Sequence, residues 1–177
     1  LLTSYTSCGR LYEVDMRLRP SGNSGLLVAS LEAFADYQKK EAWVWEHQAL
    51  TRTRVLAGDP ALHQAFDQCR ADILGQQRDK SQLLADVIQM REKMRTHLDT
   101  GKGADEFDLK QGAGGIIDIE FMVQYLVLAW SGRYPELMRY PDNIRQIESA
   151  LTLGLLDPET AQALTETYKV YRAQTHR

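Results

Sequence analysis

The chain has 177 residues, of which 44% are hydrophobic and 25% are charged, a composition that can bury a substantial core and argues against disorder. Its formal net charge of -3 at pH 7 excludes a general electrostatic attraction to nucleic acid or to an anionic membrane surface. Two cysteines, Cys8 and Cys69, lie far apart and outside any disulfide or metal-binding motif, which favours reduced thiols and a cytoplasmic location.

The first predicted element is a β-strand from Leu11 to Arg19. Hydrophobic side chains alternate with charged ones, so Glu13, Asp15, Arg17 and Arg19 share one face. A solvated strand face would explain these charges. An acidic residue flanked by arginines is also how nucleotide-transferring enzymes present a carboxylate to Mg²⁺, which prefers oxygen ligands. The chain begins without Met and in the middle of a pattern, so we expect it to be a segment of a longer protein.

A turn-rich loop at 20–25 follows the strand and leads to the first predicted helical region. Ser30 is a typical N-cap residue, and no proline occurs again before Pro60. The pattern therefore predicts helix over 31–57, either as one long helix or as two helices joined near Lys40. Gly58 is predicted to end this region as a residue just past the helix C-terminus.

Two further helices are predicted before residue 100. Asp59 followed by proline is a start signal, and the helix is expected to run over 60–77. Asp79 or Ser81 is expected to cap the next helix, which runs to about Leu98. The apolar residues predicted to face the core from this last helix are Leu84, Val87, Ile88 and Met94.

The most apolar element is a predicted helix over 116–130, ended by Gly132. Its polar side chains are few, so it must lie in the middle of a helical bundle, and Glu120 and Gln124 interrupt the apolar run, which argues against a membrane span. A loop with glycines at 112, 114 and 115 precedes it. Such a loop suits an anion held at the N–H groups of the helix start, with Lys110 as a movable charge. The alternative is that the glycines only permit close packing and Lys110 is solvated.

The remaining part of the chain predicts an irregular segment at 134–141 and two helices. Asp142 is expected to cap a helix that runs through Leu153 and stops at Gly154. Asp157 followed by proline repeats the earlier start signal, and it predicts a last helix to about Thr175.

Two spaced motifs resemble signatures of the bacterial glutamine synthetase adenylyltransferases (glutamate-ammonia-ligase adenylyltransferases). The first carries Lys110, Gly112, Gly114-Gly115-Ile116 and Asp118-Ile119-Glu120-Phe121, and the second is Val14-Asp15-Met16-Arg17-Leu18-Arg19-Pro20 with Gly22. The resemblance continues through 36–38, 45–50 and 124–128, so it covers at least 11–130. Members of this family carry one half that adds AMP to glutamine synthetase and a related half that removes it. The amino-acid sequence over 118–126 is more similar to that of the adding, carboxy-terminal half.

The resemblance implies a mainly α fold of two parts. Residues 1–29 would be the remnant of a nucleotidyltransferase α/β domain, to which the strand belongs, and residues 30–177 would form a helical bundle. Asp15 matches the third carboxylate of a metal triad, whose other two members lie in an upstream Gly-Ser-x-Asp-x-Asp motif. That motif is not in this sequence, so the chain holds at most one third of the metal site.

The resemblance also implies roles for individual residues. Asp15 is the candidate catalytic residue and Mg²⁺ ligand. Arg17, Arg19 and Lys110 are candidates for contact with the phosphates of ATP, together with the glycine loop at Gly112, Gly114 and Gly115. Asp118 and Glu120 are candidates for orienting those basic groups or a metal. For Glu120 the alternative is a structural pair with an arginine in the core.

The function implied by the resemblance is transfer of AMP from ATP to a tyrosine of glutamine synthetase, with Mg²⁺ and ATP as cofactors. Glutamine synthetase and the nitrogen-signalling PII protein are the expected partners, without nucleic acid or membrane, in the cytoplasm. The isolated chain is expected to be inactive. The alternative is a docking or regulatory module without chemistry, because a helical domain of this kind is also shared with the uridylyltransferases that modify the PII protein.

Overall fold

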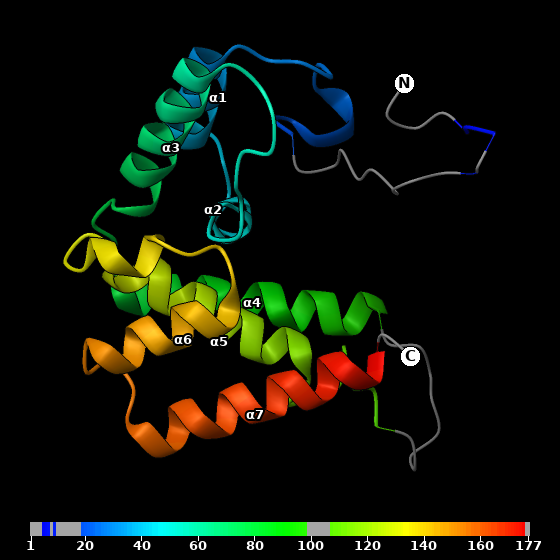
Figure 1. Ribbon diagram of the computed structural model, residues 1–177, viewed down its shortest axis with the longest axis vertical. Helices are drawn as coiled ribbons and strands as arrows, with labels where there is room; N and C mark the ends of the chain where they lie inside the picture. The colour runs from blue at the N-terminus through cyan, green and yellow to red at the C-terminus, as the bar shows by residue number, and fades with distance from the viewer. Residues whose placement is uncertain (1–4, 8, 10–18, 99–106, 176–177) are drawn as a thin grey trace. The chain divides into compact units, whose positions relative to one another are not determined.

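The computed structural model describes residues 5–7, 9, 19–98 and 107–175 (Figure 1). The chain divides into two compact units, Leu1–Ala42 and Trp43–Arg177. The described residues contain seven α-helices and two short 3-10 helices, and no β-sheet. The prediction of a mainly α fold is therefore confirmed.

The first unit contains the 3-10 helix η1 (Gly22–Ser24) and helix α1 (Leu31–Lys40). The Ser30 side chain accepts a hydrogen bond from the amide of Ala33 at 3.1 Å, which confirms the predicted N-cap. Residues 11–18 of the predicted strand lie outside the described residues. Arg19, its last residue, lies in a bend, where its Nε donates to the carbonyl oxygen of Gly25 at 3.3 Å.

The helical region after Ser30 consists of two helices, α1 and α2 (Val44–Leu50), and it ends earlier than predicted. Residues 51–57 are not helical, so the prediction that Gly58 ends a helix is wrong. The physical reason is a cap supplied from a distant part of the chain. Arg70 donates hydrogen bonds to the carbonyl oxygens of Leu50 and Thr51, both at 2.8 Å, and these satisfy the last carbonyl groups of α2.

The second unit is a bundle in which helix α5 (Ile116–Trp130) lies in the middle, as predicted (Figure 1). Helix α5 contacts α2, α4 (Lys80–Leu98), α6 (Asn143–Thr152), α7 (Pro158–Thr175) and the 3-10 helix η2 (Pro135–Met138). Helix α3 (Pro60–Leu74) packs on α2 and η2. The core residues around α5 that are at most 8% exposed include Ile116, Ile119, Val123, Val127, Leu137, Ile147, Ala150, Ala161 and Tyr168.

The predicted helix starts in this unit are confirmed. Asp59, Asp79, Asp142 and Asp157 each accept a hydrogen bond from a backbone amide two or three residues further along the chain. Gly154 follows the end of α6 with φ of +71°, the left-handed conformation expected after a helix C-terminus. In the part of the chain that the structure describes, no helix is long and apolar enough to span a membrane.

Helix α4 differs from its predicted orientation. Val87 is buried, but Leu84 is 43% exposed and Ile88 is 49% exposed, while Leu83, which was not predicted, is 3% exposed. The prediction that Leu84 and Ile88 face the core is therefore wrong. The reason is that the apolar stripe of α4 is wider than the surface of its neighbours, so one edge of the stripe borders an open groove beside α5.

Candidate functional site

The glycine loop before α5 is a compact series of turns. Asp108 Oδ1 accepts hydrogen bonds from the amides of Lys110 at 2.8 Å and Gln111 at 2.9 Å. The amide of Gly112 donates to the carbonyl oxygen of Asp108 at 2.8 Å. A Cβ atom at Gly112 would lie 2.5 Å from that same oxygen, so only glycine fits there without a shift of the backbone.

The N–H groups at the start of α5 already have acceptors within the protein. The amide of Ile116 donates to the carbonyl oxygen of Leu109 at 2.9 Å, and that of Ile117 donates to Lys110 at 3.2 Å. The amide of Gly114 donates to Asp118 Oδ2 at 2.6 Å. In this conformation these amides are not open to an anion, so the argument from unpaired helix donors does not support the phosphate role of the loop.

Gly115 is a second point of close backbone approach in this loop. A Cβ atom there would lie 2.8 Å from the carbonyl oxygen of Leu109 and 3.1 Å from that of Lys110. The glycine therefore allows the loop to fold back against the helix start, as the packing interpretation predicts. The Lys110 side chain is exposed, while its backbone is held at both ends by the hydrogen bonds described above.

Asp118 joins this loop to helix α4. Its Oδ1 accepts a hydrogen bond from Nε of Arg91 at 2.5 Å, and its Oδ2 lies 3.6 Å from Nη2 of Arg95. Arg91 is only 7% exposed and also donates to the carbonyl oxygen of Gln111 at 2.7 Å. The carboxylate is therefore placed between the glycine loop and two guanidinium groups, which fixes the loop on the bundle.

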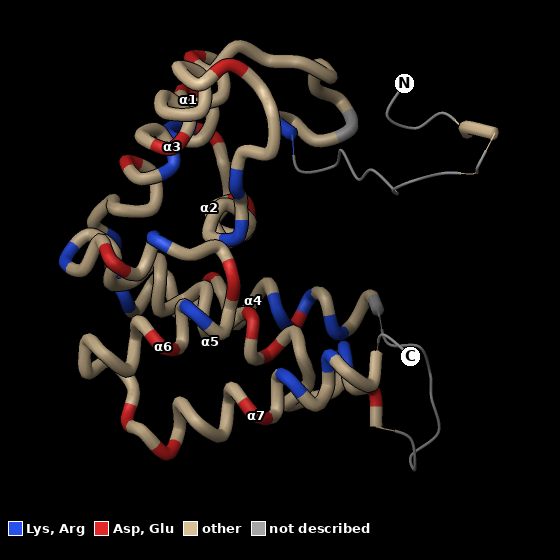
Figure 2. The backbone as a smooth tube through the Cα atoms, viewed as in Figure 1, with Lys and Arg blue, Asp and Glu red and all other residues tan. Residues whose placement is uncertain are grey.

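The sequence analysis singled out only the apolar residues of α4, so it missed both arginines. Figure 2 shows basic residues recurring along the second half of this helix. Arg91 and Arg95 are four residues apart and so lie on the same face of the helix. That spacing is the only local signal for the pair, and it is no different from the spacing of many solvated charges.

Glu120 forms a second buried polar junction. Its side chain is 15% exposed, its Oε2 lies 2.7 Å from Nη1 of Arg52, and its Oε1 accepts a hydrogen bond from the Tyr168 hydroxyl at 3.0 Å. Burial raises the pKa of Tyr168, and the negative charge of Glu120 raises this pKa further. Glu120 thus links α5 to α7 and to the segment after α2, which is the pairing with an arginine that the structural alternative predicts.

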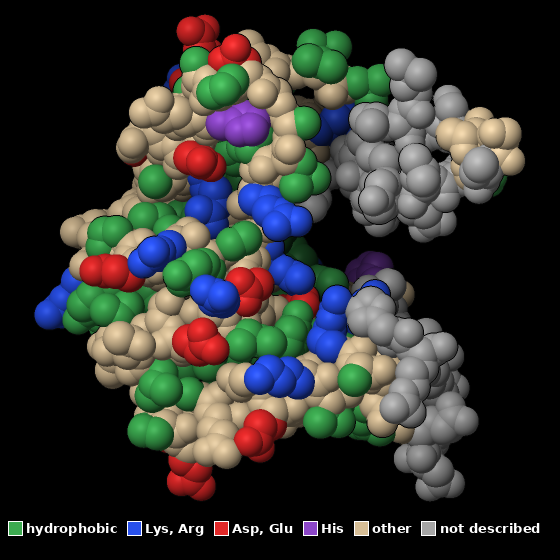
Figure 3. Space-filling view, viewed as in Figure 1, with side chains coloured by type: hydrophobic (Ala, Val, Ile, Leu, Met, Phe, Trp, Pro, Cys, Tyr) green, Lys and Arg blue, Asp and Glu red, His purple; other side chains and the backbone are tan. Residues whose placement is uncertain are grey.

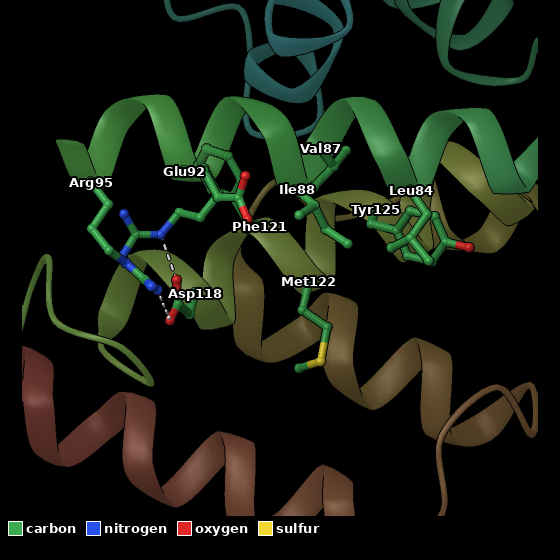
Figure 4. A pocket seen from close by; sticks show the side chains of 10 residues that line it. Leu84, Val87, Ile88, Glu92, Arg95, Asp118, Phe121, Met122 and Tyr125 are labelled. Carbon is green, nitrogen blue, oxygen red and sulfur yellow. Dashed lines mark hydrogen bonds and ion pairs between the residues drawn. The ribbon is translucent and has the colours of Figure 1, made fainter. Parts of the chain in front are cut away.

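An open groove of about 300 Å³ lies between α4 and α5, next to Asp118 (Figure 4). Leu84 and Ile88 of α4 and Met122 and Tyr125 of α5 line it, and Asp118 and Arg95 stand at one end (Figure 4). Its walls are mainly apolar. The groove therefore adds space beside the candidate residues, but it offers few groups that would recognise a phosphate.

A metal site is not formed by the described residues alone. Among them, no group of three or more His, Cys, Asp or Glu side chains is arranged to hold a metal ion. Asp118 and Glu120 each pair with arginines instead. Asp15 and Arg17 lie outside the described residues, so the structure does not place them relative to Lys110 or Arg19.

Comparisons with known proteins give two family models and a set of similar full-length enzymes. Residues 1–69 match the family model of glutamate-ammonia ligase adenylyltransferase, and residues 82–177 match that of PII-uridylyltransferase. A bifunctional glutamine synthetase adenylyltransferase/adenylyl-removing enzyme of Pseudomonas syringae pv. tomato is 54% identical over 188 residues, which is 100% of this chain and 19% of the relative. Proteins of the same name from Nitrosococcus oceani and Acinetobacter baylyi are 54% and 51% identical, again over 100% of this chain, and it spans 18% and 20% of their lengths.

The identity extends over the whole chain and is far above the level at which unrelated sequences align. It includes both motifs that carry the resemblance and the helical bundle that the structure shows. The match to the PII-uridylyltransferase model covers most of α4 and all of α5, α6 and α7. The chain is therefore homologous, over its whole length, to about a fifth of the length of the bifunctional glutamine synthetase adenylyltransferases/adenylyl-removing enzymes.

Proposed function

We propose that this chain is part of an enzyme that transfers AMP from ATP to a tyrosine of glutamine synthetase, and that it belongs to the adding half. The observation that carries this proposal is the 54% identity over the whole chain to a bifunctional adenylyltransferase/adenylyl-removing enzyme. The proposal includes a cytoplasmic location and regulation by the PII protein. Cys69 is buried and is not part of a disulfide, which is consistent with a reducing compartment.

In this proposal, different residues of the chain contribute to the binding of Mg²⁺ and of ATP. Asp15 would hold Mg²⁺ together with carboxylates from the rest of the enzyme, and Mg²⁺ supplies charge neutralisation at the phosphates. Arg17, Arg19 and Lys110 would hold the phosphate oxygens of ATP. Lys110 is suited to this role because its side chain is exposed while its backbone is held in the loop that Asp118 ties to α4.

Asp118 and Glu120 would act as positioning residues. Asp118 fixes the glycine loop from which Lys110 projects, and Glu120 fixes Arg52 at the end of α2. Both carboxylates form ion pairs with guanidinium groups in the described structure. This favours a role in orienting basic groups over a role in binding a metal.

The experiment compares the 177-residue chain with its intact parent. Each is incubated with ATP, Mg²⁺ and glutamine synthetase, and AMP bound to glutamine synthetase is measured by mass spectrometry. We expect transfer by the parent only, because one carboxylate cannot hold a catalytic Mg²⁺ ion well. Transfer by the chain alone would contradict the assignment of the metal site, and no transfer by the parent would contradict the function.

A second function is favoured by the match of residues 82–177 to PII-uridylyltransferase. We propose as the alternative that these helices dock a protein partner, glutamine synthetase or the PII protein, and take no part in chemistry. Kinetics of Lys110→Met in the parent separate the two proposals. A higher KM for ATP supports a catalytic contribution, whereas a higher KM for glutamine synthetase with unchanged ATP kinetics supports docking.

A further inference from the structure

A second cavity lies on the other side of the bundle core, beside α3 and η2. It has a volume of about 520 Å³ and is bordered by the segment after α2, by α3, and by η2 with the residues that follow it. Five titratable side chains line it, three of them arginines, and we call it the arginine pocket: Arg54, His63, Asp67, Arg70 and Arg139. All five belong to the second unit.

The arginine pocket carries an excess of positive charge. Three guanidinium groups face a single carboxylate, that of Asp67, so the four groups together carry two net positive charges. Within the described residues, the ion pairs of this unit join Arg52 to Glu120 and both Arg91 and Arg95 to Asp118, and none involves an arginine of the pocket. Figure 3 shows Lys and Arg side chains gathered over the segments between α3 and α6.

Arg70 supplies a fixed positive charge at the wall of the pocket. Its guanidinium donates to the carbonyl oxygens of Leu50 at 2.8 Å, Thr51 at 2.8 Å and Met138 at 3.0 Å. A guanidinium has five N–H donors, so two remain after these three bonds. Burial lowers the pKa of Arg70, and Asp67 offsets this lowering only in part. A bound anion would stabilise this partly desolvated charge.

Two of the other basic groups of the pocket are exposed, and the third is a half-buried histidine. Among the described residues, Nε2 of His63 has no hydrogen-bond partner, although it is shielded from solvent. Arg54 is exposed, and Arg139 is exposed with its guanidinium carbon 5.3 Å from the centre of the Tyr140 ring. Arginine donors of this kind match the oxygen atoms of phosphate in pairs.

We propose that the arginine pocket binds the phosphate group of a small molecule. A phosphate monoester carries about 1.5 to 2 negative charges at pH 7, which complements the two net positive charges of the pocket. The volume of about 520 Å³ lies within the range of small-molecule sites. The apolar side chains of Val55 and Met138 in the same wall leave room for an organic group attached to the phosphate.

The test is isothermal titration of the 177-residue chain with inorganic phosphate, pyrophosphate and AMP at low salt. The variants are Arg54→Gln, Arg139→Gln and the two combined. Both side chains are exposed and make no hydrogen bond within the part of the chain that the structure describes, so the melting temperature is expected to stay unchanged. Arg172→Gln, an exposed arginine on α7 away from the pocket, is the matched control.

We expect the double variant to bind at least tenfold more weakly than the wild type and Arg172→Gln. Tighter binding of AMP than of phosphate would assign the apolar wall to the nucleoside, and equal binding would assign the site to phosphate itself. Unchanged affinity in the double variant, or no binding of any of the three ligands at millimolar concentration, would overturn the inference.

Lys110→Met separates this inference from the proposed function. If this variant loses binding while the double arginine variant keeps it, the phosphate is bound at the start of α5 and the arginine pocket is not the site. The readout needs no activity of the parent enzyme. Failure of the inference would therefore leave the proposal of AMP transfer standing.

Discussion

Replacement of Asp118 by asparagine tests the junction between the glycine loop and α4. The carboxylate accepts from Arg91 Nε at 2.5 Å and from the amide of Gly114 at 2.6 Å. Asparagine has a single acceptor oxygen, so it can serve only one of these donors, and its amino group would face the other. The substitution also leaves the guanidinium of Arg91, whose side chain is 8% exposed, without its negative partner.

The expected cost follows from the burial of the pair. Removal of one partner from a fully buried ion pair costs about 3–5 kcal/mol. The Asp118 side chain is 27% exposed, so solvent can replace part of the lost interaction, and we expect a loss of about 2–4 kcal/mol in the free energy of unfolding. With a urea m-value of about 2 kcal/mol/M, the midpoint would fall by about 1–2 M.

The assay is urea denaturation of the chain, followed by circular dichroism, with Glu166→Gln as the control. Glu166 is exposed on α7 and accepts a hydrogen bond from Gln162 four residues earlier, so its amide variant should change stability by less than about 0.5 kcal/mol. A double-mutant cycle with Arg91→Met should give a coupling of about 1–3 kcal/mol. If Asp118→Asn shifts the midpoint no more than the control does, the junction is a solvated contact and the reasoning is refuted.

Four further predictions concern the other candidate residues. Asp15→Asn in the intact parent should remove most AMP transfer at an unchanged melting temperature, and near-normal turnover would leave Asp15 a solvated residue. Lys110→Met should raise KM for ATP by about tenfold to hundredfold without loss of stability, because one charge-assisted contact of about 1.5–3 kcal/mol is removed from an exposed side chain. Gly115→Ala should lower the free energy of unfolding by roughly 1–3 kcal/mol, since its Cβ would lie 2.8 Å from the carbonyl oxygen of Leu109; a normal melting temperature would show that the loop can relax. Since the pKa of Tyr168 is raised on folding, its contribution to stability is present below pH 10 and is lost as the pH rises through the folded-state pKa. Unfolding measured from pH 9 to 12 should therefore show a smaller decline for Tyr168→Phe than for the wild type.

Local sequence determined the places where helices begin. Ser30, Asp59, Asp142 and Asp157 each reach a backbone amide two or three residues away, so the signal and the structure it produces lie in the same short stretch. The position of α5 at the centre of the bundle also followed from sequence, because a helix that is apolar on nearly all sides must be covered on nearly all sides.

Only the tertiary structure decided where two of these helices end. Helix α2 stops at Leu50 because Arg70, twenty residues later, satisfies its carbonyl groups. Helix α3 was predicted to reach Gln77 but ends at Leu74, and Arg78 Nη1 donates both to the carbonyl oxygen of Leu74 at 3.1 Å and to that of Leu128, fifty residues later on α5, at 3.5 Å. The sequence of a helix does not indicate a hydrogen bond that a residue outside the helix donates to its last carbonyl groups.

The candidate site shows the same division between local and distant information. The motif at 110–121 identified the family and the glycine loop, and the turn at Asp108 and the close approach at Gly115 are contained within a few residues. The partners of Asp118 and Glu120 come from α4, α7 and the segment after α2, up to 68 residues away in the case of Glu120 and Arg52. Charged residues at helical spacing look alike in sequence whether they are solvated or paired, and only the packing of the helices decides which of them lose their water and meet.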